Sequence, residues 1–258
     1  MNIDLRSSVK NAEREFYNKR AEKRATEYRS WREIFPEYLK APYFAFLSKF
    51  PKKVGSDFKI LELCCGMGEF SFDIAEITQA SVLATDISDK SIEVCRKRLA
   101  RHPSPNLTFL VSDVETLELP QNSFDIVCMS GGLSYIDLDV VLERIKRWLK
   151  PEGSFICVDT LGHNPLYNAK RWCNFIFGKR TKQTLLGIPK IDTIKRISRC
   201  FEETEVNFFS IFAFVGPFLK PLIGDDKTVR FVNFLDRKFS FLGKYGFKFV
   251  LVGKGLKR

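Results

Sequence analysis

A regular alternation of short apolar segments with helical segments, from residue 59 to residue 162, is the feature that most restricts the fold of this chain. The strand-like segments are rich in β-branched and aromatic residues and lie at 59–65, 81–88, 106–113, 123–131 and 154–162. Helical patterns occupy 68–79, 88–102 and 137–153. Short apolar strands separated by helices predict a parallel sheet with helices on both faces. The sequence therefore predicts a doubly wound, mostly parallel α/β domain.

Two regions flank this alternation. Residues 1–55 have a helical pattern broken at Pro36 and Pro42, and we expect them either to pack on the core or to form a lid over a neighbouring pocket. Residues 56–160 form the predicted core. Residues 161–258 belong to the same domain and begin with a basic, aromatic insertion that interrupts the alternation. The predicted elements of this last part are a helix at 191–201, a strand at 204–215, a helix at 225–246 and a strand at 247–255. The two closing strands predict an antiparallel edge.

Glycines occupy the turn after the first strand, in the stretch "LELCCGMGEF" at residues 61–70. Gly66 and Gly68 follow a strand and precede a helix, where a doubly wound sheet brings its backbone close to a ligand. Glu62 lies at the end of the same strand, and Asp86 ends the second. A carboxylate at the second strand end can accept hydrogen bonds from both hydroxyls of an adenosine ribose. The pattern predicts a nucleoside site at this edge of the sheet.

The third strand ends at Asp113, which is placed to accept a hydrogen bond from an adenine amino group, with the Val114 amide as a donor to the ring. This constellation resembles the class I S-adenosylmethionine-dependent methyltransferases, over residues 16–160 and the closing strand. The resemblance implies an enzyme with a seven-stranded Rossmann-like sheet and S-adenosylmethionine as its cofactor. It also implies that the cofactor is held by Glu62, Cys64, Gly66, Gly68, Asp86, Ile87, Asp113, Val114, Ser130 and Gly131, the last two of which would face the sulfonium.

Cys64 departs from the family pattern, which often has glycine at this position of the turn. A small side chain there is expected to weaken cofactor binding modestly at most. A nicotinamide dehydrogenase is the nearest rival, but it would require G-x-G-x-x-G, and Ser71 stands in place of the third glycine. The methyl donor is therefore favoured.

Composition limits the remaining classes. The seven cysteines are scattered and include no C-x-x-C pair, and the two histidines, His102 and His163, lie far apart, so we predict reduced thiols and no metal site. The net charge of +11 at pH 7 favours an anionic partner or serves solubility alone. No apolar run is long enough to span a membrane, and the N-terminus lacks a signal-peptide core. A cytoplasmic protein is expected, with peripheral contact at the inner face of the membrane left open by the Phe-rich stretch at 208–224.

Candidate acceptor-side residues follow the last parallel strand. His163 lies on the carboxyl-end side of the sheet, where a base would take a proton from the acceptor, although a lone loop histidine often has only a surface or capping role. Asp159 is a candidate to orient His163. Tyr167 and Tyr135 are candidates for orienting the acceptor. We predict these roles from position alone.

The favoured function is O-directed methyl transfer to a sugar hydroxyl of a nucleotide-linked, lipid-linked or polymeric glycan. This prediction depends on the basic and aromatic insertion and on a resemblance of the region after Thr160 to methyltransferases of bacterial surface-polysaccharide biosynthesis. A lipid-like, quinone-like or other small-molecule acceptor is the alternative, suggested by the Phe content, and a non-catalytic S-adenosylmethionine-binding protein is a further one. The acceptor is expected to tolerate or carry negative charge. Nucleic acid is not expected because its methyltransferase motifs are missing, and oligomerisation through the Phe-rich strip stays open.

Overall fold

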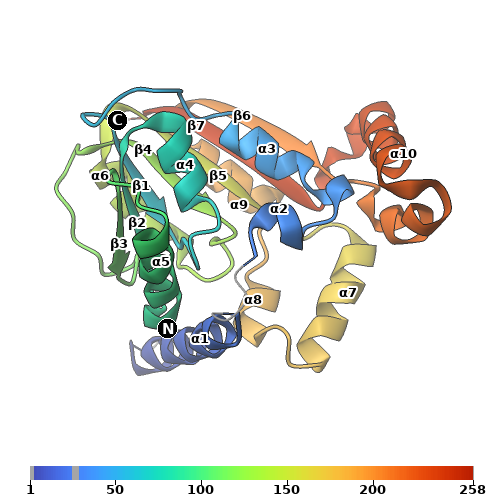
Figure 1. Ribbon diagram of the computed structural model, residues 1–258, viewed down its shortest axis with the longest axis horizontal. Coiled ribbons are helices and arrows are strands. Elements are labelled where there is room, and N and C mark those ends of the chain that lie inside the picture. Colours follow the sequence, from blue (N-terminus) through green and yellow to red (C-terminus); the bar gives the residue numbers. More distant parts are fainter. Residues whose placement is uncertain (1–2, 25–28, 258) are drawn as a thin grey trace.

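The computed structural model describes residues 3–24 and 29–257, and within them it shows one mixed sheet between layers of helices (Figure 1). The order of its seven strands is β3-β2-β1-β4-β5-β7-β6, with β1 to β5 parallel and β7 antiparallel to both β5 and β6. The strands are β1 (Lys59–Leu63), β2 (Ser81–Asp86), β3 (Leu107–Val111), β4 (Phe124–Ser130), β5 (Leu149–Thr160), β6 (Phe201–Phe209) and β7 (Lys248–Leu256). The predicted fold class is confirmed, including the antiparallel closing edge.

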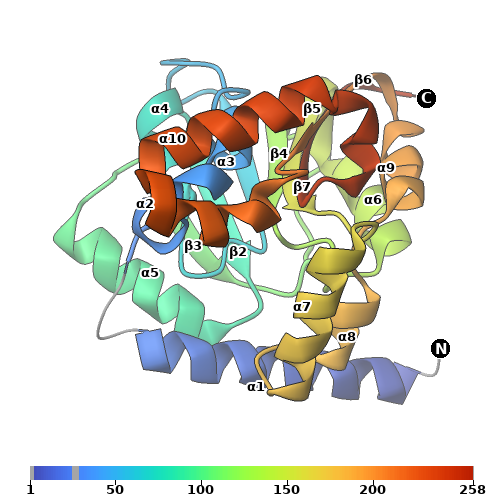
Figure 2. The same cartoon turned by 90° about the vertical axis from the view of Figure 1, so that its right-hand side faces the viewer.

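Helices precede, alternate with and follow the parallel strands. Before the sheet come α1 (Ile3–Arg24), α2 (Trp31–Ile34), the 3₁₀ turn η1 (Glu37–Leu39) and α3 (Ala41–Leu47). Between the strands lie α4 (Ser71–Thr78), α5 (Asp89–Arg101) and α6 (Leu138–Trp148). After β5 come α7 (Pro165–Ile176), α8 (Lys182–Leu186), α9 (Ile191–Ser198), η2 (Ala213–Val215), α10 (Gly216–Lys238) and η3 (Ser240–Tyr245). Figure 2 shows α7 and α10 together on one side of the molecule.

The core consists of two apolar layers, one on each face of the sheet. Alternation along β1 sends Ile60 to the face covered by α3, α4 and α5, and Leu61 to the face covered by α6 and α9. Both side chains are fully buried, as are Trp31 in the first layer and Trp148 in the second. Burial on both faces explains why these strands are almost continuously apolar.

Side-chain caps fix where several helices begin. The Ser88 Oγ atom accepts a hydrogen bond from Ser91 N at the start of α5, at 3.0 Å. Asp137 Oδ1 accepts from Val140 N at the start of α6, and Asn164 Oδ1 accepts from Leu166 N at the start of α7. Such caps satisfy amides that have no partner inside the helix.

The predicted helix at 137–153 ends earlier than expected, because β5 begins at Leu149. Leu149 pairs with Phe124 of β4, and the register shifts before Ile126 pairs with Ser154. Gly153 sits in the resulting tight bend, where an added Cβ would lie 2.9 Å from Lys150 O. Pairing with β4 therefore prevails over continuation of the helix.

The predicted strand at 204–215 instead runs from Phe201 to Phe209. Its end is fixed by Asp236 of α10, whose carboxylate accepts hydrogen bonds from Ser210 N at 2.8 Å and Phe212 N at 3.0 Å. The following helix also begins before residue 225, at Gly216, and it is interrupted at Gly224, which has a φ of 79°.

The cysteines occupy several different environments in the described part of the chain. All seven cysteines are free, and Cys128 and Cys157 are buried in strands as small apolar side chains. Residues 3–24 and 29–257 contain no cluster of three or more potential metal ligands. None of the helices in this part of the chain is long and apolar enough to cross a membrane.

Replacement of Phe155 by alanine tests the packing of the second core layer. Phe155 is fully buried and stacks on Phe201, with ring centroids 6.2 Å apart. We expect Phe155→Ala to lower the free energy of unfolding by about 3–5 kcal/mol because it leaves a cavity. Phe241→Ala is the matched control, since this ring is 76% exposed, and it should change the value by no more than about 0.5 kcal/mol. Equal effects in denaturant unfolding would contradict the assigned core.

Candidate functional site

A cavity of about 600 Å³ lies at the carboxyl ends of the parallel strands. Its floor is formed by the ends of β1, β2, β4 and β5 and by the turn before α4, and α1 lies across it. Ligand sites of doubly wound sheets form at this edge. The cavity is lined at the predicted cofactor positions by Glu62, Cys64, Gly66, Asp86, Ile87, Asp113, Val114, Ser130 and Gly131. Of the predicted set, only Gly68 does not line it directly.

The turn after β1 adopts left-handed backbone conformations. Gly66 and Gly68 have φ angles of 58° and 72°. A Cβ at Gly68 would lie 3.2 Å from Cys95 Sγ and 3.4 Å from the Phe109 ring, so this glycine allows the turn to pack against α5 and β3. Cys64 also has a positive φ, of 55°. This conformation favours glycine, which explains why a glycine is typical there, and the cysteine is held in it by its surroundings.

Glu62 is buried beneath the turn. Its Oε2 atom accepts a hydrogen bond from the Ser71 hydroxyl at the start of α4. Burial raises the pKa of the Glu62 carboxyl to about 8, and the Ser71 bond opposes this shift only partly. Ser71, which argued against a dehydrogenase, thus has a positive role that sequence reasoning missed: it orients the carboxyl group at the strand end.

Asp86 joins the glycine turn to the start of α5. Its Oδ2 accepts from Gly66 N at 2.8 Å, and its Oδ1 accepts from Ser88 N at 2.9 Å. Burial raises the pKa of this carboxyl to about 6, although both backbone hydrogen bonds oppose the shift and Glu69 adds to it. The two bonds fix the carboxylate while each oxygen keeps a second lone pair for a ligand.

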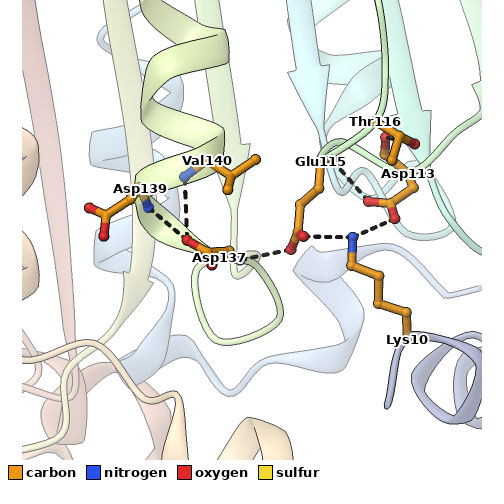
Figure 3. Close-up of polar contacts among 7 residues, drawn as sticks. All are labelled: Lys10, Asp113, Glu115, Thr116, Asp137, Asp139 and Val140. Atoms are coloured by element: carbon orange, nitrogen blue, oxygen red, sulfur yellow. Dashed lines mark hydrogen bonds and ion pairs between the residues drawn. The ribbon is translucent and has the colours of Figure 1, made fainter. Parts of the chain in front are cut away.

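Asp113 is engaged by a residue that the sequence analysis did not select. Figure 3 shows the Lys10 ammonium of α1 between the carboxylates of Asp113 and Glu115, and it lies 2.8 Å from Glu115 Oε2. The other Asp113 oxygen accepts from Glu115 N at 2.9 Å. Glu115 also accepts from Asp137 N at 2.8 Å, at the start of α6. The predicted bond from an adenine amino group to Asp113 would therefore be shared with Lys10.

Two further contacts hold α1 over the cavity. The Tyr17 hydroxyl donates a hydrogen bond to the Tyr135 hydroxyl, and the two rings meet edge to face with centroids 5.3 Å apart. Asn18 Oδ1 accepts from the Ser88 hydroxyl at 2.7 Å. Because Ser88 caps α5, next to Asp86, the position of α1 is tied to the cofactor end of the cavity.

The predicted catalytic residues are only partly brought together. Tyr135 lines the cavity, and burial raises the pKa of its hydroxyl. His163 does not line it; its Nε2 accepts from Ile191 N at 3.0 Å, where α9 begins. Burial, followed by Lys190 and Lys244, lowers the pKa of His163. This contact is of the capping kind, and a role of His163 as a base stays an untested prediction.

Tyr167 and Asp159 also make internal contacts. The buried Tyr167 hydroxyl donates to Ser210 O at 2.8 Å and does not reach the cavity. Asp159 does not orient His163, because its Oδ2 accepts from Leu133 N at 2.9 Å and its Oδ1 from Thr160 N at 2.6 Å. The wall residues that the sequence analysis missed are Tyr17, Phe35, Tyr43, Arg180, Phe247 and Lys248. Their separation in sequence gave no local signal for this grouping.

The site fits a nucleoside cofactor on its own geometry. Gly131 has a φ of 71°, and a Cβ added there would meet no atom within 4 Å, so cavity space lies directly against the backbone at the end of β4. Gly66 also lines the cavity at the end of β1, although a Cβ added there would lie 3.0 Å from Glu69 Oε2. With Asp86 fixed between these turns, the chain offers a carboxylate and two exposed backbone stretches along one wall.

Residues 60–153 match the family model described as "Methyltransferase domain". Fold and match agree on the class of protein: over these residues the chain is similar to methyltransferase domains, which supports the predicted enzyme class and the predicted cofactor, S-adenosylmethionine. Among curated proteins the chain is similar to the demethylmenaquinone methyltransferase of Lactococcus lactis subsp. lactis (strain IL1403), with 34% identity over 118 residues, 44% of this chain and 47% of that protein. It is 31% identical over 127 residues to the ubiquinone/menaquinone biosynthesis C-methyltransferase UbiE of Rhodopseudomonas palustris (strain BisB5), 46% of this chain and 50% of that one. The chain thus spans about half the length of these relatives.

Solved structures share the fold at low identity. Phosphoethanolamine N-methyltransferase 2 of Haemonchus contortus, in complex with S-adenosylmethionine, has a TM-score of 0.63 at 20% identity, covering 87% of this chain and 54% of that chain. Geranyl diphosphate C-methyltransferase of Streptomyces coelicolor A3(2) has a TM-score of 0.56 at 13% identity, covering 84% and 79%. The coverage of this chain extends beyond the matched domain into the flanking elements.

Titration of Asp86 should control cofactor affinity. Ribose hydroxyls donate to an ionised carboxylate, and the raised pKa means that Asp86 binds a proton below about pH 6. The dissociation constant of S-adenosylhomocysteine should therefore rise about tenfold per pH unit below pH 6 and level off above it. Calorimetric titration between about pH 5 and about pH 7 tests this, because the Glu62 carboxyl, with its pKa of about 8, stays largely protonated there.

The control for this titration is Asp86→Asn, which cannot ionise. It should bind more weakly at neutral pH and lose the dependence on pH. A wild-type affinity that is constant across the range would contradict the role of Asp86.

Proposed function

We propose that this chain transfers a methyl group from S-adenosylmethionine to a small, ring-shaped and largely apolar acceptor of the quinone or quinol type. The observation that carries the proposal is the aromatic lining of the cavity beyond the predicted cofactor positions. This lining consists of Tyr17, Phe35, Tyr43, Tyr135 and Phe247. The two curated relatives described above carry names of quinone methyltransferases, which supports the same acceptor class.

Flat apolar walls favour a flat apolar acceptor. Phe35 stacks on Tyr43 with centroids 4.7 Å apart, and Tyr43 stacks on Phe70 at 5.3 Å, so these rings form a rigid wall. Aromatic rings offer large contact areas at low entropic cost, and offset or edge contacts with a substrate ring add further stabilisation. A cavity of about 600 Å³ is within the range for sites that bury most of a small ligand.

Catalysis in this arrangement depends chiefly on positioning. The bound cofactor supplies an activated methyl group. Glu62, Asp86 and the turn at Gly66 would hold it against one wall, and the aromatic wall would hold the acceptor in line with it. Such orientation can supply about 7–11 kcal/mol of the barrier. The helix α1 lies over the cavity and would limit the entry of water. The Tyr17–Tyr135 hydroxyl pair would close the cavity beside the acceptor.

The glycan acceptor predicted from the sequence is not favoured. The comparisons do not support the resemblance to polysaccharide biosynthesis, and the relatives agree with the quinone-like alternative. The aromatic and basic insertion that suggested glycans forms α7, α8 and the loop between them. Asn174 of α7 and Arg180 of this loop line the cavity. The non-catalytic alternative would require a cofactor site without an acceptor site.

Defined acceptors test the proposal. We expect methylated product from a short-chain demethylated naphthoquinol under reducing conditions, and none from nucleotide-linked sugars. Asp86→Ala should abolish product because it removes a cofactor contact rather than an acceptor contact. Product from a sugar nucleotide with none from the quinol would contradict the acceptor class, and cofactor binding without product from any acceptor would favour the non-catalytic alternative.

The placement of the candidate side chains leads to a kinetic prediction. Tyr135→Phe removes the hydroxyl pair beside the acceptor, so kcat/KM should fall about tenfold or more. His163→Ala should leave kcat within about threefold, because His163 lies outside the cavity wall. Steady-state kinetics of the two variants provides the comparison, and a large loss only in His163→Ala would restore the histidine as the base.

We further propose a peripheral contact with anionic lipid, which would give access to a lipid-soluble acceptor. The helices α7 and α10 lie on the face turned to the viewer in Figure 2 and expose large apolar side chains. These are Leu166, Trp172, Ile176, Phe218, Leu222, Ile223, Phe231 and Phe234. Exposed cations lie among them, at Lys170, Lys220, Lys227, Arg230, Arg237 and Lys238. Apolar side chains mixed with cations complement the surface of an anionic bilayer.

Vesicle sedimentation tests this contact. The chain should bind vesicles of phosphatidylglycerol more strongly than vesicles of phosphatidylcholine. The double variant Phe218→Ser, Leu222→Ser should weaken binding about tenfold or more, because a side chain of this size contributes about 1.5–3 kcal/mol when its apolar surface is fully buried and less when it inserts only in part. Phe44→Ser on α3 is the control, since this ring is also exposed, at 52%, but belongs to neither α7 nor α10, and the variant should bind as the wild type does. Equal binding of all variants would contradict the assigned surface.

A further inference from the structure

Three cationic side chains gather at the acceptor end of the cavity, and neither the cofactor site nor the aromatic wall accounts for them. Arg180 and Lys248 line the cavity. Arg171 lies behind Phe247, with its Cζ atom 5.4 Å from the centroid of that ring. The three come from different elements: Arg171 from α7, Arg180 from the loop before α8, and Lys248 from the start of β7. Arg171 and Lys248 are only 4% and 7% exposed.

Hydrogen bonding of these cations is incomplete. Arg171 Nη1 donates to Leu161 O at 2.9 Å and to Asn168 Oδ1 at 2.7 Å, whereas its buried Nη2 has no hydrogen-bond partner among the described residues. The buried Nε of Arg180 is likewise unpartnered within the described part of the chain. Buried polar atoms normally have partners, and an unpaired one costs about 1–3 kcal/mol, more for a charged group.

Lys248 faces aromatic rings instead of a paired carboxylate. Its Nζ lies 5.0 Å from the Tyr43 ring centroid and 5.7 Å from that of Phe247. Neither an ion pair nor a hydrogen bond engages this ammonium among residues 3–24 and 29–257. Burial lowers the pKa of Lys248 to about 8, and Arg171 and Arg180 lower it further while Asp159 opposes them. Arg171 Cζ and Lys248 Nζ lie 5.4 Å and 5.7 Å from the centroid of the same Phe247 ring, and Arg180 lines the cavity together with Lys248.

Two carboxyl groups face the cluster and offset its charge only in part. Both Asp159 oxygens already accept backbone hydrogen bonds, from Leu133 N and Thr160 N. The charge of Arg180 lowers the pKa of the Glu13 carboxyl of α1, but burial has the larger effect and raises it. Burial likewise raises the pKa of Asp159. Three cations thus meet at most two anions in a buried setting, where an added anion would be strongly attracted.

We propose that Arg180 and Lys248 bind an anionic oxygen group, a carboxylate or a phosphate, carried by the methyl acceptor, with Arg171 reinforcing the charge from behind Phe247. This subsite rests on the proposed function, since it assumes that the aromatic end of the cavity holds the acceptor, and it specifies that the acceptor's ring bears an acidic substituent. A guanidinium donates paired hydrogen bonds to carboxylate or phosphate, and an ammonium adds a point charge.

Binding of three probes that share a 2-substituted naphthalene ring, to the protein loaded with S-adenosylhomocysteine, tests the subsite without requiring turnover. The probes are 2-naphthoate, 2-naphthyl phosphate and the neutral 2-naphthylmethanol. We expect at least one anionic probe to bind about tenfold or more tightly than the neutral one, and the tighter of the two anions identifies the group. Arg180→Gln and Lys248→Gln should each remove most of this preference and leave the affinity for 2-naphthylmethanol unchanged.

The matched control is Lys179→Gln, which removes an equal charge from the exposed neighbour of Arg180 and should keep the preference. Equal affinities for all three probes, no measurable binding of either anion, or a preference that survives in both Arg180→Gln and Lys248→Gln would overturn the subsite. These results are independent of the quinol assay: an intact preference without quinol methylation would count only against the proposed acceptor class.

Discussion

The two hydrogen bonds that the Asp86 carboxylate accepts, from Gly66 N and Ser88 N, are the interaction on which the site depends. They join the glycine turn after β1 to the start of α5, and Ser88 in turn bonds to Asn18 of α1. A single strand-end carboxylate thus sets the positions of the cofactor turn, a core helix and the covering helix. The parallel sheet makes this arrangement available, because its strand ends meet at one edge.

The residues of the site that belong to local sequence patterns could be predicted from the sequence. Gly66 and Gly68 stand between a strand and a helix, and Glu62 and Asp86 end adjacent strands, so order along the chain already implied their proximity. The structure places Glu62, Gly66 and Asp86 along one cavity, with Gly68 packed against α5 and β3, while the individual bonds of these residues to a cofactor stay predictions. The departure from the family pattern at Cys64 also has a physical explanation: its φ of 55° shows that this position requires a left-handed backbone conformation, which favours glycine.

The remainder depends on tertiary contacts that no local pattern shows. Lys10 reaches Asp113 from a helix more than a hundred positions away. His163 follows a strand that ends at the cavity, but its ring turns toward the start of α9, and position along the chain could not reveal this direction. After residue 200 the observed ends of the strand and helix differ from the predicted ones. Asp236 of α10 accepts hydrogen bonds from the backbone that directly follows β6, and this contact forms only when α10 folds back against the end of that strand.

The two ends of the cavity differ in how closely their chemistry is defined. At the donor end, buried carboxyl groups and left-handed turns fit a nucleoside cofactor. At the acceptor end, aromatic walls and three incompletely paired cations indicate a ring that carries negative charge. The exposed apolar faces of α7 and α10 belong to the same segment of the chain as Arg171 and Arg180, so membrane contact and acceptor binding would be coupled through one region.

Transfer of labelled methyl from S-adenosylmethionine into a fractionated cell extract tests the central claim most directly, with Asp86→Ala as the control for cofactor dependence. The account predicts label in the small, lipid-soluble acidic fraction and none with the variant. Label in polysaccharide, protein or nucleic acid, or equal labelling by the variant, would contradict it.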